Sequence, residues 1–304
     1  MNKTLSVVVP VYKKTDMFLN NLAHNIPLLP KNAEIIIVDD ASQEYLSEKM
    51  EPFLKKQSIK LLENPKNLGF SGAINRGIKA AHGAHILLLN SDVRLIKKFP
   101  ENYEKFFSED PRIAAIAFAE KNGDKLLGKS TIAFARGLVT HSRAKNTERG
   151  LTAWANGGSC LFRADRLNEL NGFDEMYSPF YWEDIDLSYR AYSRGWSVLF
   201  NPEYSVEHAR ESTINTYYTS VKVKHIAHRN QFIFTWSNIT DIDLIIKHFA
   251  WLPFHLVVMS IKGETQFISG FLSALQFIPT IFKRRSVKLH KQKLTDKEVF
   301  SLFA

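Results

Sequence analysis

Residues 34–42 have the sequence Glu34-Ile35-Ile36-Ile37-Val38-Asp39-Asp40-Ala41-Ser42, in which an unbroken β-branched run ends in two carboxylates. A strand that is apolar at successive positions is typical of a sheet covered on both faces. The polar residues that follow mark the end of the strand. The stretch therefore predicts one strand of a buried sheet with reactive groups at its carboxyl end.

The segments around this strand alternate between strand-like and helix-like patterns. We expect further strands at residues 5–12, 59–63 and 85–89, and helices near residues 15–26, 45–56 and 71–82. Thr15 or Asp16 is the expected N-terminal cap of the first helix. Alternation at this spacing predicts an α/β fold with a mainly parallel central sheet and flanking helices.

Beyond residue 112 the pattern is less regular. Later strands are expected at residues 154–162 and 196–200, followed by a turn at Pro202. The polar, basic residues 141–150 are interpreted as a loop near the site of an acceptor. A further helix is expected at residues 217–234.

Polar groups follow three of the expected strands. They are Pro10-Val11-Tyr12, Asp39-Asp40 and Asn90-Ser91-Asp92. Ligands of open α/β sheets bind outside the carboxyl ends of the strands, so these groups are expected to surround one site. Asp92 suits a hard divalent cation shared with a diphosphate, although such a sequence after a strand is more often only a turn.

A dense acidic cluster occupies residues 181–190, which have the sequence Tyr181-Trp182-Glu183-Asp184-Ile185-Asp186-Leu187-Ser188-Tyr189-Arg190. Neighbouring carboxylates repel one another unless a cation, a proton or a cationic substrate offsets their charge. With His208 further along the chain, they form a candidate metal and base site. The alternative is a solvated helix start, where acids favour the positive end of the dipole, together with a structural histidine.

The glycine-rich loop has the sequence Asn67-Leu68-Gly69-Phe70-Ser71-Gly72-Ala73-Ile74-Asn75-Arg76-Gly77. It is not a dinucleotide fingerprint, because that motif belongs in the first strand-to-helix turn, and it lacks the Lys-Ser/Thr pair of a phosphate-binding loop. It is either a tight turn that begins a helix or a helix N-terminus next to a nucleotide sugar. In the second case Gly69 and Gly72 allow close approach of the backbone.

Composition limits the class of protein. A chain of 304 residues with 45% hydrophobic and 23% charged residues can bury a sizeable core, which argues against extensive disorder. The single cysteine, Cys160, excludes an internal disulfide and fits a reducing compartment. The apolar run at residues 5–9 is too short for a secretory signal. We therefore expect a cytoplasmic protein, or one bound to the inner face of a membrane.

The net charge of +9 is unevenly spread, and six basic residues lie between Lys283 and Lys293 with no acid among them. Two uncharged apolar runs precede them, at residues 249–261 and 267–282. Each run contains a proline and is shorter than the ~20 residues of a membrane-spanning helix. Short apolar helices beside a basic cluster favour an anionic membrane surface over nucleic acid. The alternative is packing on the main domain or a homo-oligomer interface.

Seven short motifs occur in a characteristic order: Val7-Val8-Val9-Pro10-Val11-Tyr12, Ile37-Val38-Asp39-Asp40-Ala41-Ser42, Asn67-Leu68-Gly69-Phe70, Leu88-Leu89-Asn90-Ser91-Asp92, Gly157-Gly158-Ser159, Gly172-Phe173-Asp174-Glu175 and Trp182-Glu183-Asp184. Through them the chain resembles family 2 glycosyltransferases with the nucleotide-sugar GT-A fold, especially rhamnosyltransferase-like and galactofuranosyltransferase-like members. The resemblance implies a GT-A domain at residues 1–215. Residues 216–304 then form a C-terminal helical region that associates with a membrane or oligomerises.

The resemblance also implies roles for single residues. Asp184 is implied as the catalytic base, Asp92 and His208 as ligands of Mg²⁺ or Mn²⁺, and Trp182 and Glu183 as acceptor contacts. The implied contacts of the nucleotide sugar are Pro10, Tyr12, Asp39, Asp40, Asn67, Gly69, Asn75, Asn90 and Ser91. One departure is Asn90, which stands where the family's Asp-x-Asp motif has its first acid.

These expectations describe a metal-dependent, inverting glycosyltransferase of bacterial surface-polysaccharide synthesis, peripheral on the inner face of the plasma membrane. Its donor is a nucleotide sugar, with dTDP-rhamnose favoured and a UDP-sugar next. Its acceptor is a hydroxyl of a lipid-linked or lipopolysaccharide glycan. One alternative is a nucleotidyltransferase acting on sugar phosphates, whose glycine-rich basic loop is missing after Val9. Another is a non-catalytic membrane-binding module.

Overall fold

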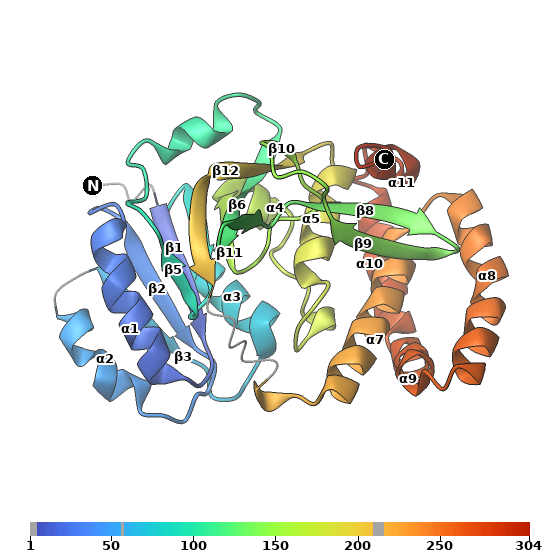
Figure 1. Ribbon diagram of the computed structural model, residues 1–304, viewed down its shortest axis with the longest axis horizontal. Coiled ribbons are helices and arrows are strands. Elements are labelled where there is room, and N and C mark those ends of the chain that lie inside the picture. The colour runs from blue at the N-terminus through green and yellow to red at the C-terminus, as the bar shows by residue number, and fades with distance from the viewer. Residues whose placement is uncertain (1–4, 56–57, 209–215) are drawn as a thin grey trace.

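In the computed structural model, which describes residues 5–55, 58–208 and 216–304, a ten-stranded mixed sheet crosses the centre of the molecule (Figure 1). Its strands are β1 (Leu5–Val11), β2 (Glu34–Asp39), β3 (Ile59–Glu63), β4 (His85–Leu89), β5 (Val93–Leu95), β6 (Ile113–Asn122), β7 (Lys125–Leu127), β10 (Gly150–Leu151), β11 (Ser159–Arg163) and β12 (Ser197–His208). Their order is β10-β12-β6-β11-β4-β1-β2-β3, with β5 paired to β12 and β7 paired to β6.

The N-terminal half of the sheet is parallel, as the sequence predicts. β1 pairs in parallel with β2 on one side and with β4 on the other, and β2 pairs in parallel with β3. Beyond β4 the sheet is mixed, because β11 runs antiparallel between β4 and β6. The predicted α/β class, with flanking helices and a C-terminal helical extension, is confirmed.

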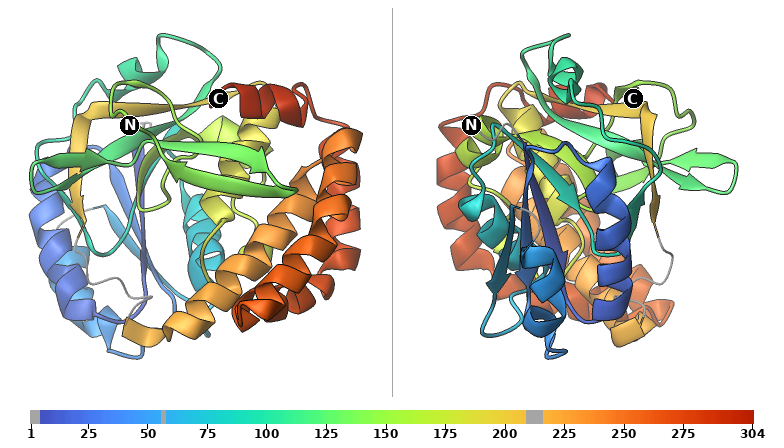
Figure 2. Two further views of the ribbon diagram at one scale, coloured as in Figure 1. Left: turned by 45° about the vertical axis from the view of Figure 1, so that its right-hand side comes forward. Right: turned by 90° about the vertical axis from the view of Figure 1, so that its left-hand side faces the viewer.

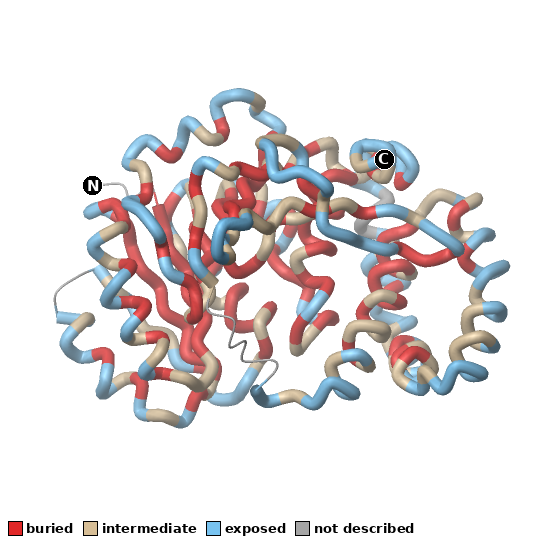
Figure 3. The backbone as a smooth tube through the Cα atoms, in the orientation of Figure 1, coloured by how far each residue is buried: buried red, intermediate tan, exposed pale blue. Residues whose placement is uncertain are grey.

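Helices cover both faces of the sheet, because successive residues of a strand point to opposite sides. One core joins Val7 and Val9 of β1 to Phe18 of α1 (Thr15–Asn25). The other joins Val8 of β1 to Ile74 of α3 (Gly69–Ala80). Every residue of β1 and β2 is buried, which explains the nearly continuous apolar sequence of these strands (Figure 3).

Shorter helices and one hairpin complete this part of the chain. The helices are η1 (Ile26–Leu28), α2 (Leu46–Leu54), η2 (Tyr103–Phe107), α4 (Ala164–Glu169), η3 (Glu175–Tyr177) and α5 (Glu183–Ser193). The hairpin consists of β8 (Ser130–Ala135) and β9 (Leu138–Arg143). Residues 141–143 of the predicted loop 141–150 therefore belong to a strand.

The predicted cap of the first helix is wrong. Lys14, rather than Thr15 or Asp16, is the N-cap of α1, and its side chain makes no capping hydrogen bond. The Thr15 hydroxyl instead donates to the Glu44 carboxylate at 2.8 Å. A tertiary partner has therefore replaced the local capping bond that the sequence suggests.

Two predicted strand limits also differ from the structure. β11 begins at Ser159 rather than at residue 154, because a turn precedes it in which the Ser159 amide donates to the Asn156 carbonyl at 3.1 Å. β12 does not end at Pro202 but continues to His208. A register shift between residues 201 and 205 accommodates the proline, which cannot donate to the ladder.

The C-terminal helices form a group at one end of the molecule, beside the β8–β9 hairpin (Figure 2). They are α7 (Ser220–Asn238), α8 (Ile242–Ile261), α9 (Thr265–Leu275), α10 (Ile278–Leu289) and α11 (Asp296–Ser301). Phe234 of α7 packs edge-on against Tyr189 of α5, with ring centroids 5.2 Å apart. The Tyr189 hydroxyl donates to buried Asp296 at 2.7 Å. The boundary at residue 215 stays a prediction, but residues on either side of it share one core.

Helix α8 is longer than the apolar run that the sequence analysis identified. It has 20 residues and a mean hydropathy of 1.6, so by length and composition alone it could cross a membrane. The pair formed by α9 and residues 278–286 of α10 passes the same test together but is bent by 63°. The length of α8 therefore does not exclude a membrane span, although the shorter apolar run at residues 249–261 had suggested that it does.

Polar contacts hold one side of α8 against the hairpin. His248 is buried, and its Nδ1 lies 2.6 Å from the Gly137 carbonyl while its Nε2 accepts from Trp236 Nε1 at 2.9 Å. His255 Nε2 lies 2.7 Å from the Arg136 carbonyl. This side of α8 is thus fixed to the β8–β9 turn.

The contacts of Asp296 predict a stability effect. Asp296→Ala should lower the free energy of unfolding by about 3 kcal/mol. The Asp296 carboxylate accepts hydrogen bonds from the buried Tyr189 hydroxyl and from the backbone amides of Thr240 and Asp241, and the substitution removes all three. Urea unfolding measures the loss. Lys297→Ala is the control, since its ion pair with Asp243 is exposed to solvent and should contribute little to stability. Equal, small effects of both variants would show that α11 is not fixed to the core.

Candidate active site

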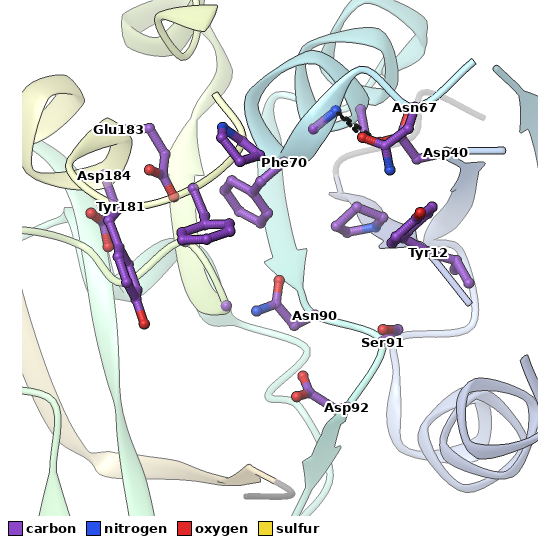
Figure 4. Close-up of a pocket in the computed structure, with 18 of the residues that line it drawn as sticks. Tyr12, Asp40, Asn67, Phe70, Asn90, Ser91, Asp92, Tyr181, Glu183 and Asp184 are labelled. Atoms are coloured by element: carbon purple, nitrogen blue, oxygen red, sulfur yellow. Dashed lines mark hydrogen bonds between the residues drawn. The ribbon is translucent and has the colours of Figure 1, made fainter. Parts of the chain in front are cut away.

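A pocket of about 370 Å³ opens at the carboxyl ends of β1, β2 and β4 (Figure 4). Tyr12, Asp40 and Asn67 lie on one side of it, and Glu183 and Asp184 lie on the other. The segment from Asn90 to Asp92 lies between the two groups. The polar groups at the three strand ends therefore surround one site, as the sequence predicts.

Asp40 anchors the loop that begins α3. Its buried carboxylate accepts from the Leu68 amide at 2.8 Å, the Gly69 amide at 2.9 Å and the Asn64 side chain at 2.7 Å. Gly69 has a φ of +75°, a conformation that favours glycine. Burial raises the pKa of Asp40, although these hydrogen bonds oppose the rise. Asp40 thus shapes the pocket wall as well as lining it.

Strand pairing brings Asp92 and His208 together although 116 residues separate them. β5 follows Asp92 and pairs antiparallel with β12, so Val93 lies opposite His208. His208 Nε2 lies 3.0 Å from Asp92 Oδ1, and its Nδ1 lies 3.4 Å from Glu120 Oε1 on β6. Burial by itself lowers the pKa of His208, but the hydrogen bonds to Asp92 and Glu120 raise it to about 10.

The two acids at the start of α5 differ in their surroundings. Burial and the neighbouring Asp184 raise the pKa of Glu183 well above its usual range. Burial also raises the pKa of Asp184, to about 6, against the opposing amide hydrogen bonds from Ile185 and Gly157. Asp184 is therefore ionised near neutral pH, and the surroundings of Glu183 favour its protonated form.

Asp186, the third acid of the cluster, does not line the pocket. Its buried carboxylate accepts from Arg190 Nε at 2.7 Å, the Tyr177 hydroxyl at 3.0 Å and Asn238 Nδ2 at 2.7 Å. Arg190 also donates to two backbone carbonyls, those of residues 170 and 172. Asp186 therefore fixes α5 to its surroundings, while Glu183 and Asp184 face the pocket.

Most of the predicted site residues line the pocket. They are Pro10, Tyr12, Asp40, Asn67, Gly69, Asn90, Ser91, Asp92, Glu183, Asp184 and His208. The proposed contacts of these residues with substrates and metal stay predictions.

Three predicted site residues lie outside the pocket lining. Asp39 accepts from the Ser42 amide at 2.9 Å. Asn75 donates to the Phe173 carbonyl at 2.8 Å. The buried Trp182 ring packs against Phe234 with centroids 5.1 Å apart. These side chains hold the walls of the site together, and the substrate roles predicted for them stay predictions.

Other residues line the pocket without a predicted role. They are Val11, Phe70, Ala73, Asn156, Gly157, Gly158, Pro179, Phe180, Tyr181 and Tyr218. Gly157 and Gly158 belong to one of the motifs that carry the family resemblance. In the structure the backbone amide of Asn90 donates to the Gly158 carbonyl at 2.9 Å. Nothing local marks Glu120 or Tyr218, because only strand pairing and the C-terminal chain bring them to the site.

Two buried atoms of the lining lack a partner. Within the part of the chain that the structure describes, Asn90 Oδ1 and Glu183 Oε2 have no hydrogen bond. Buried polar atoms in folded proteins are normally satisfied, so these two atoms are suited to bind polar groups of a ligand. No lysine or arginine lines the pocket among the described residues.

Asn230 of α7 holds the segment that leads into the acidic cluster. It is fully buried, and its Nδ2 donates to the carbonyls of Tyr177 at 2.8 Å, Phe180 at 3.0 Å and Tyr181 at 2.8 Å. Phe180 and Tyr181 line the pocket four and three residues before Asp184. The C-terminal region thus helps to position the acidic side of the site.

A family model places the chain among known proteins. The model described as Glycosyl transferase family 2 matches residues 6–170, which is more than half of the sequence. The chain belongs to glycosyl transferase family 2. Its match with poly-beta-1,6-N-acetyl-D-glucosamine synthase of Staphylococcus aureus (strain MSSA476) is 23% identical over 201 residues. That match covers 65% of this glycosyltransferase and 48% of the synthase, so the chain spans about half the length of the curated relatives it matches.

Solved structures share the fold of this glycosyltransferase. TarS 1–349 of S. aureus in complex with UDP-GlcNAc has a TM-score of 0.59 and 17% identity, covering 99% of this chain and 89% of that chain. GalNAc-T7 with UDP, GalNAc and Mn²⁺ has a TM-score of 0.61 and 19% identity, covering 77% of this chain and 48% of that chain. Identities this low show the GT-A fold alone.

The contacts of Asn230 predict a positioning role that a matched pair of variants tests. Asn230→Asp replaces the donating amide with a carboxylate oxygen, which cannot bind the three carbonyls. The acidic side of the site should then shift slightly, and a small displacement of reacting groups should lower the sugar-transfer rate by about 10²-fold. Binding of nucleotide should change little, since Tyr12 and Asp40, which are predicted to contact it, lie on the opposite side of the pocket.

The control is Gln231→Glu, an equivalent substitution at the next residue, where the amide donates to the Val139 carbonyl of the hairpin at 2.9 Å. It should leave the transfer rate almost unchanged. Equal losses of nucleotide binding and transfer in Asn230→Asp would indicate general misfolding instead of positioning.

Proposed function

We propose that this glycosyltransferase moves a sugar from a nucleoside-diphosphate sugar to a hydroxyl of a glycan, with inversion and with the help of a divalent metal ion. The observation that carries the proposal is one pocket holding Asp184, with a pKa of about 6, together with the Asp92–His208 pair. The first group suits proton removal and the second suits a diphosphate-bound cation. If the protein were a nucleotidyltransferase or a non-catalytic module, the raised pKa of Asp184 would have no role.

Asp184 is the proposed general base. It accepts the proton of the acceptor hydroxyl while the hydroxyl oxygen forms a bond to the anomeric carbon of the donor. The bond from that carbon to the diphosphate breaks in the same step, and the diphosphate leaves with the electron pair. A base with a pKa near the working pH combines the ionised state with useful basicity. Asp184, with a pKa of about 6, meets this requirement, whereas burial and the neighbouring Asp184 carboxylate favour the protonated form of Glu183.

Glu183 has a different proposed role. Its carboxyl is buried beside Asp184, which raises its pKa and favours the neutral form, and Glu183 Oε2 has no partner in the described residues. A neutral carboxyl offers one donor and one acceptor to a sugar hydroxyl. We therefore assign Glu183 to acceptor binding, next to the base that removes the proton.

The residues present fit a divalent metal ion. Asp92 would offer a carboxylate oxygen and His208 the Nε2 nitrogen that now faces Asp92, while Glu120 keeps the other ring nitrogen. His208 would release the proton from Nε2 on binding the metal, because a metal ligand must be deprotonated. The described residues contain no group of three or more acidic, histidine or cysteine side chains that could hold a metal alone. The remaining ligands would come from the diphosphate, which is usual for Mg²⁺ sites. A bound Mg²⁺ or Mn²⁺ neutralises the charge that develops on the leaving diphosphate.

The proposed donor is a pyrimidine nucleoside-diphosphate sugar. The resemblance to rhamnosyltransferases favours dTDP-rhamnose. The structurally similar TarS was solved with UDP-GlcNAc, which supports a UDP-sugar as the second candidate. Tyr12 provides an aromatic face at the nucleotide side of the pocket, and bases stack on such faces regardless of their identity. Turnover measured across dTDP-rhamnose, UDP-GlcNAc, other UDP-sugars and GDP-mannose decides the donor. Exclusive use of GDP-mannose would contradict the pyrimidine assignment.

The proposed acceptor is a lipid-linked or lipopolysaccharide glycan, and the proposed location is the inner face of the plasma membrane. Large apolar side chains of α8 are exposed, including Ile242, Ile246, Phe254 and Ile261. The other side of α8 is fixed to the β8–β9 turn, which favours a helix lying along the membrane surface over one that spans it. A homo-oligomer that covers α8 is the competing proposal.

Substitutions in the acidic pair test the base. Asp184→Asn should lower the transfer rate by about 10²–10⁴-fold with nucleotide binding retained. Glu183→Gln is the control, because glutamine keeps the size and the hydrogen-bonding capacity of the carboxyl proposed to bind the acceptor, and this variant should lose far less activity. The opposite order of effects would assign the base to Glu183.

The pH dependence gives a second test of the base. Because Asp184 must be ionised to accept a proton, wild-type kcat/KM should fall as the pH decreases through about 6. The residual activity of Asp184→Asn should lack this step. A wild-type profile without it would remove Asp184 from the role.

The metal assignment predicts a change in nucleotide binding. Asp92→Ala and His208→Ala should each weaken Mn²⁺-dependent binding of UDP or dTDP by about 10–100-fold, as measured by calorimetry. Glu207→Ala, at the exposed neighbour of His208, should bind as the wild type does. In excess chelator all four proteins should bind nucleotide equally weakly. Chelator-insensitive binding by the wild type would overturn the assignment.

A further inference from the structure

The C-terminal helices enclose a second cavity, separate from the active-site pocket. It has a volume of about 330 Å³ and is bounded by α7, α8, α9 and α10. Its walls are almost entirely apolar and include Trp236, Leu252, Phe271, Leu275 and Phe282. Protein interiors contain few voids larger than a water molecule, and apolar cavities of this kind take apolar ligands. The cavity is therefore suited to a hydrocarbon group.

The rim of the cavity opens to the surface. Phe249 of α8 and Phe282 of α10 line it, yet they are 61% and 69% exposed. Ile242, Ile246 and Phe249 follow at helical spacing of four and three residues, so they form one exposed apolar stripe that leads to the rim. A chain entering the cavity would come from an apolar phase that covers this stripe.

The charge around the rim selects the kind of lipid. No acid occurs in the sequence between Glu264 and Asp296, whereas Lys283, Arg284 and Arg285 adjoin the rim residue Phe282. Arg284 is engaged elsewhere, in an ion pair with Asp174 at 2.8 Å. Arg285 lines the cavity and donates to the Trp236 carbonyl at 2.7 Å, and Lys283 is exposed. Positive charge at the mouth of an apolar cavity complements an anionic headgroup.

We propose that this cavity binds one hydrocarbon chain of an anionic phospholipid drawn from the membrane on which α8 lies. The inference rests on the proposed membrane location but goes beyond it. A surface-bound helix needs only a bilayer, whereas a cavity takes a single lipid in a defined stoichiometry. Bound lipid also bridges α7, whose Asn230 holds the acidic side of the active site, to α8, α9 and α10.

A pair of variants on one helix separates the cavity from the surface. Leu275 lines the cavity, whereas Leu272, one turn earlier on α9, is 55% exposed and lies outside the lining. Leu275→Trp should fill the cavity, and Leu272→Trp adds the same apolar group at the surface. Full-length protein is mixed with vesicles of phosphatidylglycerol, and the protein–lipid complexes are counted by native mass spectrometry.

The wild type and Leu272→Trp should retain one phosphatidylglycerol per chain, and Leu275→Trp should bind it about tenfold more weakly or worse, because several buried methylene contacts are lost. Phosphatidylcholine should bind more weakly than phosphatidylglycerol in the wild type. Retained nucleotide binding checks that each variant is folded. If Leu275→Trp fails this check, Leu252→Trp, which fills the cavity from α8, replaces it.

Three outcomes would overturn the proposal: equal phosphatidylglycerol binding by both tryptophan variants, equal binding of phosphatidylcholine, or binding of a polyprenyl phosphate alone. The last outcome would assign the cavity to a lipid-linked acceptor. Because the assay measures lipid without sugar transfer, its result is independent of the proposed catalytic function.

Discussion

The ion pair between buried Asp186 and largely buried Arg190 fixes the element that carries the acidic side of the candidate active site. Taking both charges out of water is costly unless hydrogen bonds satisfy the groups completely. Here Tyr177 and Asn238 donate to the carboxylate, and Arg190 donates to carbonyls at residues 170 and 172. The pair therefore joins α5 to the preceding loops and to α7. With α5 held in this way, Glu183 and Asp184 keep a fixed orientation at the pocket.

The same burial that fixes α5 also separates the roles of its acids. Asp186 is fully hydrogen-bonded, whereas Glu183 Oε2 has no partner among the described residues. Burial raises the pKa of both Glu183 and Asp184, and backbone amides that donate to Asp184 oppose the rise there. Of three acids within four residues, one therefore anchors α5 and two face the pocket in different surroundings, which is the basis of the separate roles proposed for them. Their chemistry follows from their neighbours, since the residue types are nearly identical.

The C-terminal helices contact the candidate active site on one side and present an apolar surface on the other. Polar side chains of α7 face inward, where Asn230 and Asn238 bind groups around α5. Apolar side chains of α8 face outward and remain exposed at the end of the molecule. Arg284 and Asp174 connect the basic segment to the GT-A core. The C-terminal helices are therefore joined by hydrogen bonds and one ion pair to the segment that carries the acidic side of the pocket.

The sequence by itself determined the parallel half of the sheet and the polar strand ends, because apolar runs and the residues that end them are local signals. Asp40 and Asp92 could be assigned to one site on that basis, whereas Asp184 was assigned through the acidic cluster and the family resemblance. Only the tertiary structure decided which neighbours act on them. The pairing of β5 with β12 sets His208 beside Asp92, and β6 adds Glu120, across separations that no local pattern encodes. The cap of α1, the passage of β12 through Pro202 and the contacts of Asn230 were likewise decided by long-range partners, because burial and hydrogen bonding override local propensity once the chain is folded.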